Sequence, residues 1–414
     1  MKFSKNKTME DFSAANEIQD LQYFGEFGGV NPSISDSSTY TFLSAKTMFD
    51  TFEGNTDGCY LYSRHSSPTN LYLAQALAKL EGTESANVTA SGMGAITSVL
   101  MQLCKAGDHI ISSRTIYGGT YAFLKNFLPD YGVLTSFVDI GNFDVIENAI
   151  NENTKVIYCE TVSNPLLEVA DLRKLSDLCK KHNLKLVVDN TFSPLQISPV
   201  LFGADVVIHS LTKFINGSSD TVGGVYCATQ DFINDTKNVN SGACMLLGPT
   251  MDSLRASSIL KNLRTLHIRM KQHSINALYL AQRFEQDGLR VCYPGLASHK
   301  NHELYKKMMR EEYGFGGLLT LDVKTTEKAN EVMELMQKEN LGYLAVSLGF
   351  YKTLFSASGS STSSEIPEEE REQMGLSDGL IRFSIGLDHD IERTYQKMKS
   401  CLEKVGVFSE LELS

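Results

Sequence analysis

A lysine stands among hydroxyl-bearing and small residues in the stretch HSLTKFINGSSDTVGG, which covers residues 209–224. Lys213 follows the apolar run ADVVIH, a pattern typical of a buried strand, and precedes a glycine-rich turn. A lysine amine in such a half-buried place can lose its proton and act as a nucleophile. Ser210 and Thr212 offer hydroxyl donors beside it, either to a bound anion or to the turn itself. Residues elsewhere in the chain must decide between these interpretations.

Three other stretches carry residue types that would complete a cofactor site. SGMG, residues 91–94, lies between a strand pattern and a helix pattern, where backbone amides bind phosphate and glycines allow close approach. Asp189 ends the apolar run of VVDNTF, and a carboxylate there needs either a capping role or a cationic partner. Tyr117 in TIYGGT precedes two glycines, so its ring could lie over a pocket, with a core position as the alternative.

Together these features match what a pyridoxal-phosphate site requires. Such a site needs a phosphate cradle, a carboxylate that keeps the ring nitrogen protonated, a stacking ring and a lysine that forms a Schiff base. A nucleotide-binding P-loop does not fit, because the chain has no GxxxxGK[ST] pattern and Lys213 follows a threonine.

Composition excludes several other classes of function. The 414 residues include 42% hydrophobic and 21% charged side chains, which is typical of globular proteins and long enough for two or three domains. The net charge of −11 argues against nucleic acids and anionic membranes as partners. No apolar run is long enough to span a bilayer, and the first twenty residues lack a signal-peptide core, so we expect a cytoplasmic protein.

The cysteines and histidines do not form recognisable ligand sets. Eight cysteines are scattered without a CxxC pair, which predicts neither a disulfide framework nor a zinc site. His299 and His302 are close in sequence, but no third ligand type clusters with them, so we expect no metal.

Strand and helix patterns alternate through the first two thirds of the chain. Short β-branched runs such as GDHIISS, KVIYCET, LKLVVDN and ADVVIHS are separated by helical segments such as LRKLSDLCKKHN. This alternation predicts an α/β fold with a mostly parallel sheet covered by helices on both faces. Active sites in such sheets lie beyond the carboxyl ends of the strands, which is where Asp189 and Lys213 fall.

The pattern changes near residue 260. A long helical segment leads to GFGGLLTLDV, LGYLAVSLG and GLIRFSIGLD, which read as strands of a smaller α+β domain. The serine-rich patch SASGSSTSSEIPEEEREQ interrupts this region and reads as a surface loop or a lid. Because it follows Ser347 closely, we expect residues 356–364 to close over the site.

Several stretches resemble the Cys/Met-metabolism family of pyridoxal-phosphate enzymes. They are YLYSRHSSPTN, SGMGAI, YGGT, ETVSNP, VVDNTF, HSLTKFINGSSD, YPGLASH, AVSLG and GLIRFSIG, in the family's order from about residue 25 to residue 390. FGEFGGVN, LLGPTM and SLGFYKTLFSASGSSTSSE are most similar to the methionine gamma-lyase subgroup found in plants and some bacteria. The resemblance implies the type I fold of pyridoxal-phosphate-dependent transferases, with a seven-stranded-type sheet and a smaller C-terminal domain.

The resemblance also implies domain boundaries and an assembly. Residues 1–62 would form an N-terminal arm that contacts a neighbouring subunit, residues 63–259 the cofactor-binding domain and residues 260–414 the C-terminal α+β domain. The active sites would form in a homodimer, and two such dimers would form a homotetramer.

Residue roles follow from positions that match the family's motifs. Lys213 would anchor the cofactor, Tyr117 would stack on its ring and pass a proton to the leaving thiol, and Asp189 would pair with the ring nitrogen. The cofactor phosphate would be bound by Gly92, Met93, Ser210 and Thr212, and that of the neighbouring subunit by Tyr62 and Arg64. Asn164 would contact the phenolic oxygen of the cofactor ring. The substrate carboxylate would be bound by Ser347 and Arg382.

The chain departs from the family's patterns at a few positions. Gly119 stands where many bacterial methionine gamma-lyases have a cysteine, and Val162 stands where other members have proline. Val346 stands where several cystathionine lyases have a glutamate, and an apolar side chain suits a thioether tail better. The expected reaction is α,γ-elimination of L-methionine to methanethiol, 2-oxobutanoate and ammonia. The alternatives are γ-replacement, as in O-acetylhomoserine sulfhydrylase or cystathionine gamma-synthase, a cystathionine lyase, and a non-catalytic protein on the same scaffold.

Overall fold

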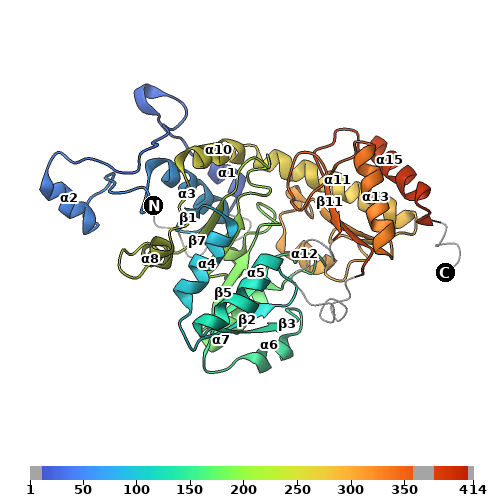
Figure 1. Ribbon diagram of the computed structural model, residues 1–414, viewed down its shortest axis with the longest axis horizontal. Helices are drawn as coiled ribbons and strands as arrows, with labels where there is room; N and C mark the ends of the chain where they lie inside the picture. The colour runs from blue at the N-terminus through green and yellow to red at the C-terminus, as the bar shows by residue number, and fades with distance from the viewer. Residues whose placement is uncertain (1–11, 358–376, 409–414) are drawn as a thin grey trace.

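The computed structural model describes residues 12–357 and 377–408 of the chain (Figure 1). Two sheets, each with its own helices, lie side by side along the long axis, and the segment before residue 63 projects from the end that carries the larger sheet (Figure 1). None of the helices in these ranges is both long and apolar enough to cross a membrane. Ser356 and Ala357, the first two residues of the expected lid, belong to a buried strand, and the rest of the lid falls outside the described residues.

The larger sheet has seven strands, and the expected mostly parallel arrangement is confirmed. From one edge to the other, its strands are β1 (Ser85–Thr89), β7 (Gly224–Ala228), β6 (Val206–Ser210), β5 (Lys185–Asp189), β4 (Thr154–Glu160), β2 (His109–Ser113) and β3 (Leu134–Val138). Strands β6, β5, β4, β2 and β3 are parallel, whereas β7 runs antiparallel to both of its neighbours. The carboxyl ends of the five parallel strands therefore meet at one edge.

Helices cover both faces of this sheet because both faces are apolar. On one face, α4 (Gly92–Leu103) and α5 (Gly118–Ala122) share a buried core with residues such as Val187 and Ile208. On the opposite face, α3 (Pro68–Glu81), α7 (Leu172–His182) and α10 (Ser253–Leu263) pack on Val188 and Val207. Neighbouring residues of one strand thus enter different cores, as the period of two requires.

Shorter helices complete this part of the chain. They are α6 (Phe143–Ala149), α8 (Gln230–Thr236) and α9 (Ala243–Leu247), with single turns of 3₁₀ or π helix near residues 123–131 and 199–202.

The smaller sheet has five strands and a separate core. Its order is β10 (Tyr343–Leu344), β11 (Leu354–Ala357), β12 (Leu380–Ser384), β9 (Leu318–Asp322) and β8 (Arg290–Cys292), and its helices are α11 (Leu266–Gln286), α13 (Thr326–Lys338) and α15 (Ile391–Lys404). Helix α12 (His302–Met308) follows β8 in sequence, but its Tyr305 and Met308 belong to the core of the larger sheet. The stretch LGYLAVSLG, expected to be a strand, pairs only over Tyr343–Leu344 and then continues as a loop. The domain boundary at residue 260 stays a prediction, although α11 begins close to it.

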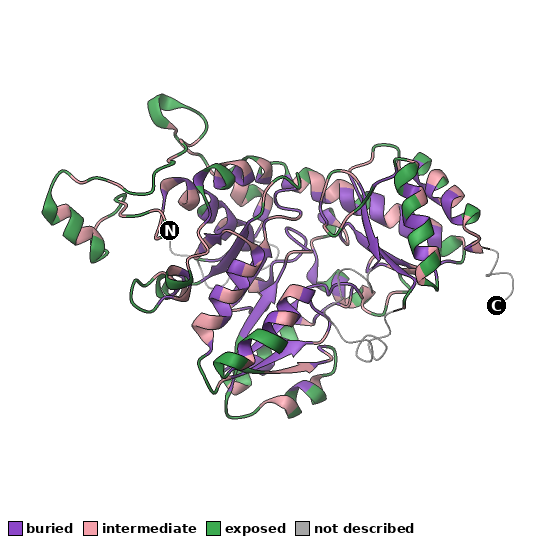
Figure 2. Ribbon diagram, in the orientation of Figure 1, coloured by how far each residue is buried: buried purple, intermediate pink, exposed green. Residues whose placement is uncertain are grey.

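The N-terminal segment differs from both sheets in its exposure. Its first helix, α1 (Ala14–Gln19), packs against α3, and Tyr23 Oη donates to the carbonyl of Tyr72 at 2.8 Å. The following loops, one of which carries α2 (Ala45–Phe52), project away from the larger sheet and are largely exposed (Figure 2).

Candidate active site

A cavity of about 270 Å³ lies at the carboxyl ends of β4, β5 and β6. Ten of the twelve predicted site residues line it: Gly92, Met93, Tyr117, Asn164, Asp189, Ser210, Thr212, Lys213, Ser347 and Arg382. They come from segments up to 290 residues apart in sequence, counted from Gly92 to Arg382. A larger cavity of about 530 Å³ lies between the N-terminal segment and helices α10 and α11, and none of the predicted residues lines it.

The first turn of α4 forms one end of the cavity. Ser91 caps this helix by accepting a hydrogen bond from the Gly94 amide at 3.0 Å. A Cβ atom at Gly92 would lie 2.9 Å from Cβ of Ser210, so only glycine lets β6 approach the helix this closely. The free amides of the first turn and the Ser210 and Thr212 side chains together form an end suited to an anion.

Asp189, at the end of β5, lines the same cavity. Its Oδ1 atom accepts hydrogen bonds from the Thr191 amide at 2.9 Å and from Thr191 Oγ1 at 2.5 Å. Burial raises the pKa of this carboxyl, and the two Thr191 hydrogen bonds oppose the rise. A cationic nitrogen placed in the cavity would compensate the buried carboxylate.

Lys213 projects into the cavity from the turn after β6. Its Nζ lies 3.1 Å from Oγ of Ser347, which belongs to the loop between the two short strands β10 and β11. Burial, together with the positive charge of Arg382, lowers the pKa of the Lys213 amine to about 8. The amine is thus much closer to its neutral, nucleophilic form at physiological pH than an ordinary lysine.

Arg382 on β12 is a buried cation. Its Nη1 donates to Asn164 Oδ1 at 3.0 Å and its Nη2 to the Ser347 carbonyl at 3.1 Å. Its Nε has no hydrogen-bond partner within the described part of the chain. Burial lowers the pKa of the guanidinium to about 10. A buried guanidinium with an unused donor is suited to bind a carboxylate of a small ligand.

Glu160, at the end of β4, was missed by sequence reasoning although it begins the motif ETVSNP. Its two oxygens accept the backbone amides of Tyr117 at 2.7 Å and of Asn164 at 3.0 Å. Burial and the nearby Asp189 carboxylate raise the pKa of this carboxyl. Glu160 therefore joins the segments that carry two predicted site residues. Its place at the end of an apolar strand, like that of Asp189, was the available signal.

Tyr117 lies at the mouth of the cavity, with its side chain about half exposed. A Cβ atom at Gly119 would lie 2.6 Å from the Tyr117 ring, so the ring occupies the space that a cysteine would need at this position. Glycine at 119 and the observed position of the Tyr117 ring are therefore coupled.

Tyr62 and Arg64, the two remaining predicted residues, do not line the cavity of their own chain. Arg64 Nη1 donates to the Met245 carbonyl at 3.0 Å, and its guanidinium lies 5.8 Å from the Tyr62 ring centre. The Tyr62 side chain is about half exposed. The expected role of both residues in a neighbouring subunit stays a prediction.

The cavity fits the groups of pyridoxal phosphate. Helix amides and hydroxyls at one end match the phosphate, the carboxylate of Asp189 matches a protonated ring nitrogen, and the Lys213 amine matches the aldehyde. The close approach of Gly92 to Ser210 keeps the phosphate end free of a side chain. Within the described residues, no three His, Cys, Asp or Glu side chains group as metal ligands.

Comparison with known proteins agrees with this geometry. Residues 15–402 match the family model described as Cys/Met metabolism PLP-dependent enzyme. Methionine gamma-lyase of Arabidopsis thaliana is 43% identical over 396 residues, which cover 94% of this chain and 90% of the relative. L-methionine gamma-lyase of Fusobacterium nucleatum subsp. polymorphum is 36% identical, covering 92% of this chain and 95% of the relative.

A solved structure shares the fold as well as the sequence similarity. It is an O-acetylhomoserine (thiol)-lyase from Campylobacter jejuni subsp. jejuni that carries N'-pyridoxyl-lysine-5'-monophosphate. Its TM-score is 0.87 at 30% identity, covering 95% of this chain and all of the other. The expected type I fold is thereby confirmed. The chain belongs to the Cys/Met-metabolism family of pyridoxal-phosphate-dependent enzymes.

Proposed function

We propose that this enzyme is a carbon–sulfur lyase that converts L-methionine to methanethiol, 2-oxobutanoate and ammonia by α,γ-elimination. The observation that carries the choice of substrate is the charge distribution in the cavity. Of the described residues that line it, only Lys213 and Arg382 are cationic, and the wall at Val346 is apolar. One cation can hold the α-carboxylate of methionine, but no second cation remains for the distal carboxylate of cystathionine. The similarity to methionine gamma-lyases supports the same substrate.

The cofactor, when bound, supplies an aldehyde for the substrate amine and a ring that stores the electrons released at Cα. Arg382 orients the substrate through its carboxylate, so that the Cα proton points to Lys213. The Lys213 amine takes this proton, and its lowered pKa of about 8 makes the neutral form accessible. Removal of a second proton, from Cβ, then expels the thiolate from Cγ, and water finally releases ammonia and 2-oxobutanoate. Ser347 Oγ, 3.1 Å from Nζ, holds the amine near the reacting carbon.

Two further residues control protons at the ends of the reaction. Asp189 keeps a proton on the ring nitrogen of the cofactor, for which its fixed Oδ1 and buried charge are suited. Tyr117, exposed at the mouth of the cavity, donates a proton to the departing thiolate. Glu160 holds the Tyr117 backbone in place for this transfer.

The proposal includes an active site shared between two chains of a homodimer, within a homotetramer. The phosphate end of the cavity has helix amides and hydroxyls but no cation among the described residues of its own chain. A dianionic phosphate would be better compensated if Arg64 and Tyr62 of a neighbouring subunit reached it. Tyr62 is the last residue of the exposed N-terminal arm (residues 1–62, described from residue 12), and Arg64 follows two positions later, at the start of the cofactor-binding domain.

A cytoplasmic location is also part of the proposal. All eight cysteines are free, and six of them are buried. Unpaired cysteines in this number are typical of proteins in a reducing compartment.

The decisive test is a substrate panel with the purified holoenzyme. Methionine, homocysteine, cystathionine, cysteine and O-acetylhomoserine with sulfide would be compared by release of 2-oxo acid and thiol. We expect methionine to give both products. Turnover of O-acetylhomoserine with sulfide, without product from methionine, would instead establish γ-replacement. This is the activity for which the Campylobacter jejuni protein is named.

A further inference from the structure

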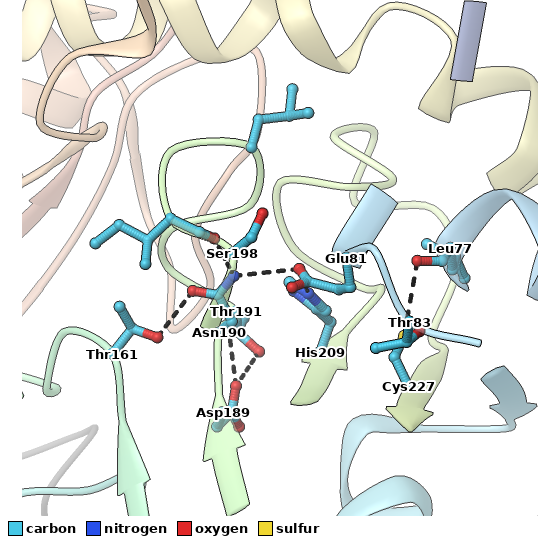
Figure 3. A network of polar contacts seen from close by, with 12 residues as sticks. Leu77, Glu81, Thr83, Thr161, Asp189, Asn190, Thr191, Ser198, His209 and Cys227 are labelled. Atoms are coloured by element: carbon cyan, nitrogen blue, oxygen red, sulfur yellow. Dashed lines mark hydrogen bonds and ion pairs between the residues drawn. The ribbon is translucent and has the colours of Figure 1, made fainter. Parts of the chain in front are cut away.

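A network of buried polar side chains surrounds the carboxylate of Glu81 (Figure 3), which does not line the cavity. Glu81, the last residue of α3, accepts a hydrogen bond at Oε1 from His209 Nε2 at 2.6 Å and from Asn190 Nδ2 at 3.2 Å. Glu81, His209 and Asn190 are at most 1% exposed. None of them lines the cavity, and the reaction outlined above uses none of them.

The three residues are nevertheless the immediate neighbours of cavity residues. Asp189 pairs with Ile208 where β5 and β6 run side by side, and the backbone N–H of Asn190 donates to the Ile208 carbonyl at 2.8 Å. Because side chains alternate between the faces of a strand, Asp189 and Ser210 point into the cavity while Asn190 and His209 point to Glu81. One carboxylate therefore accepts hydrogen bonds from the neighbours of Asp189 and Ser210 in these two strands, on the face of the sheet away from the cavity.

The side-chain amide of Asn190, which contacts Glu81, also binds two further segments of the chain. Its Oδ1 accepts from Thr161 Oγ1 at 2.8 Å, and its Nδ2 also donates to the Ile197 carbonyl at 2.8 Å (Figure 3). Thr161 follows Glu160 directly, so the residue after β4 enters the same network. The carboxyl ends of three neighbouring strands, β4, β5 and β6, are thus tied together from behind.

The network is unfavourable for stability if its only role is structural. Burying a carboxylate and an imidazole costs several kcal/mol per ionised group, and an apolar pair of the same volume often stabilises a fold more. Glu81 Oε2 and His209 Nδ1 have no hydrogen-bond partner among the described residues, which adds to this cost. Polar groups kept under such conditions are candidates for a role in geometry rather than in stability.

Electrostatics adds a second link between the network and the cavity. Burial raises the pKa of Asp189, and the His209 imidazole, like the hydrogen bonds from Thr191, acts to lower it. The other titratable groups that face Asp189 are Tyr158 and Glu160 on β4. Arg310 and Cys227 are the groups that face Glu81.

We propose that Glu81, through His209 and Asn190, is a positioning residue for the cofactor. It holds the carboxyl ends of β5 and β6 in the register that places Asp189 at the ring nitrogen and Ser210 at the phosphate. Losing it lets the two strand ends shift against each other, so the cavity no longer matches both ends of one rigid cofactor. The proposal rests on the cofactor assignment within the proposed function and does not depend on which amino acid is the substrate.

The test compares Glu81→Gln, Glu81→Leu and His209→Gln with the wild type and with His109→Gln. His109 is a matched control: it is a buried histidine of the same sheet, hydrogen-bonded to Thr154 and Ser136, and it is not near the cavity. Each protein would be stripped of cofactor and titrated with pyridoxal phosphate to obtain Kd. Visible circular dichroism of the bound cofactor and the melting temperature would be recorded on the same samples. None of these measurements involves methionine, so failure of the substrate proposal would leave them unaffected.

We expect Glu81→Leu and His209→Gln to raise the Kd for pyridoxal phosphate about tenfold, equivalent to about 1.4 kcal/mol, and to change the visible dichroism. Glu81→Gln, which keeps an acceptor but not the charge, should have a smaller effect. His109→Gln should lower the melting temperature without changing Kd or the dichroism. If the Glu81 and His209 variants only lose stability, as His109→Gln does, the network is structural and the proposal is wrong.

Should Glu81→Leu fail to fold, Thr161→Val provides an independent test. It removes the donor to Asn190 without changing a charge, and Asn190 then loses one of its three contacts. A raised Kd with little loss of stability would support the proposal, whereas an unchanged Kd and dichroism would contradict it.

Discussion

The cavity and the N-terminal arm differ in whether their side chains find partners within the same chain. In the cavity, Lys213, Asp189 and Arg382 each have a hydrogen-bond partner within the same chain. In the arm, Phe27 and Leu43 are almost fully exposed, and Phe24, Phe49 and Phe52 are also open to solvent. Such a gathering of exposed apolar side chains is typical of a surface that another chain covers. The comparison shows that the cavity residues have their partners within one chain, whereas the arm leaves apolar side chains open to solvent, as the proposed contact with a second chain requires.

The proposed chemistry of the cavity depends most on Lys213. Replacing Lys213 by alanine should lower turnover by at least about a thousandfold, because it removes both the covalent anchor and the proton acceptor. Absorption spectroscopy of the purified protein should also show loss of the band of the bound cofactor. Retention of that band with lost turnover would show that another amine anchors the cofactor.

The proposed sharing of the active site between two chains can be tested by mixing two inactive variants. If Arg64 serves the neighbouring subunit, then Lys213→Ala and Arg64→Ala should each be nearly inactive alone. Refolding or co-expressing them together should restore about a quarter of the wild-type activity, because a hybrid two-fold dimer has one site with both defects and one with neither. No recovery in verified hybrids would mean that Arg64 acts within its own chain.

The lowered pKa of Lys213 makes the cavity sensitive to pH before the cofactor is bound. Only the neutral amine attacks the aldehyde, so capture of pyridoxal phosphate by the apoprotein should accelerate roughly tenfold per pH unit and level off above about pH 8. Free Nα-acetyllysine, measured in parallel, should continue to accelerate up to about pH 10.4. Stopped-flow absorbance would follow both reactions. A rate for the protein that keeps rising with that of free lysine would contradict a shifted pKa.

The exposure of the arm predicts an effect on assembly. Leu43→Ser should shift the protein toward smaller species at low concentration, because burying a leucine contributes about 1.5–3 kcal/mol to a contact. Val145→Ser is a control with a comparable change at an exposed apolar residue of α6. Sedimentation velocity over a dilution series would compare them. An unchanged association constant for Leu43→Ser would place that residue outside any interface.

Val346 offers the smallest expected effect and tests the substrate end of the cavity. Val346→Glu should shift the ratio of kcat/KM for cystathionine to that for methionine by roughly tenfold, since a carboxylate can pair with the distal amine of cystathionine. Val346→Ala separates the added charge from the lost methyl groups. Equal ratios in all three proteins would show that this wall does not contact the substrate.

The sequence predicted the fold where local patterns were strong. The β-branched runs of β2, β4, β5 and β6 and the helix α7 were identified, because fully buried strands and an amphipathic helix have clear patterns. The edge strand β3 was not identified, since it is half exposed. The antiparallel direction of β7 was not predicted either, since the composition of a strand does not determine its direction. Tyr343–Leu344 is the only paired part of a segment that reads as a longer strand.

The same division holds for the site. Lys213, Asp189 and Tyr117 could be found because each is a reactive or polar residue at the end of an apolar run. Glu160 and Glu81 were missed because their importance lies in their partners. Glu160 matters through two backbone amides, and Glu81 through residues 109 and 128 positions away in sequence.

The sequence by itself determined the residue types, the strand ends on which they lie and the family to which they belong. Only the tertiary structure decided that Arg382 lies beside Asn164, that Ser347 contacts Lys213, and that His209 faces away from the cavity while Ser210 faces into it. The physical reason is that local periodicity records which side of a strand is buried. It does not record which of two buried sides meets the cofactor, because that depends on packing between distant segments.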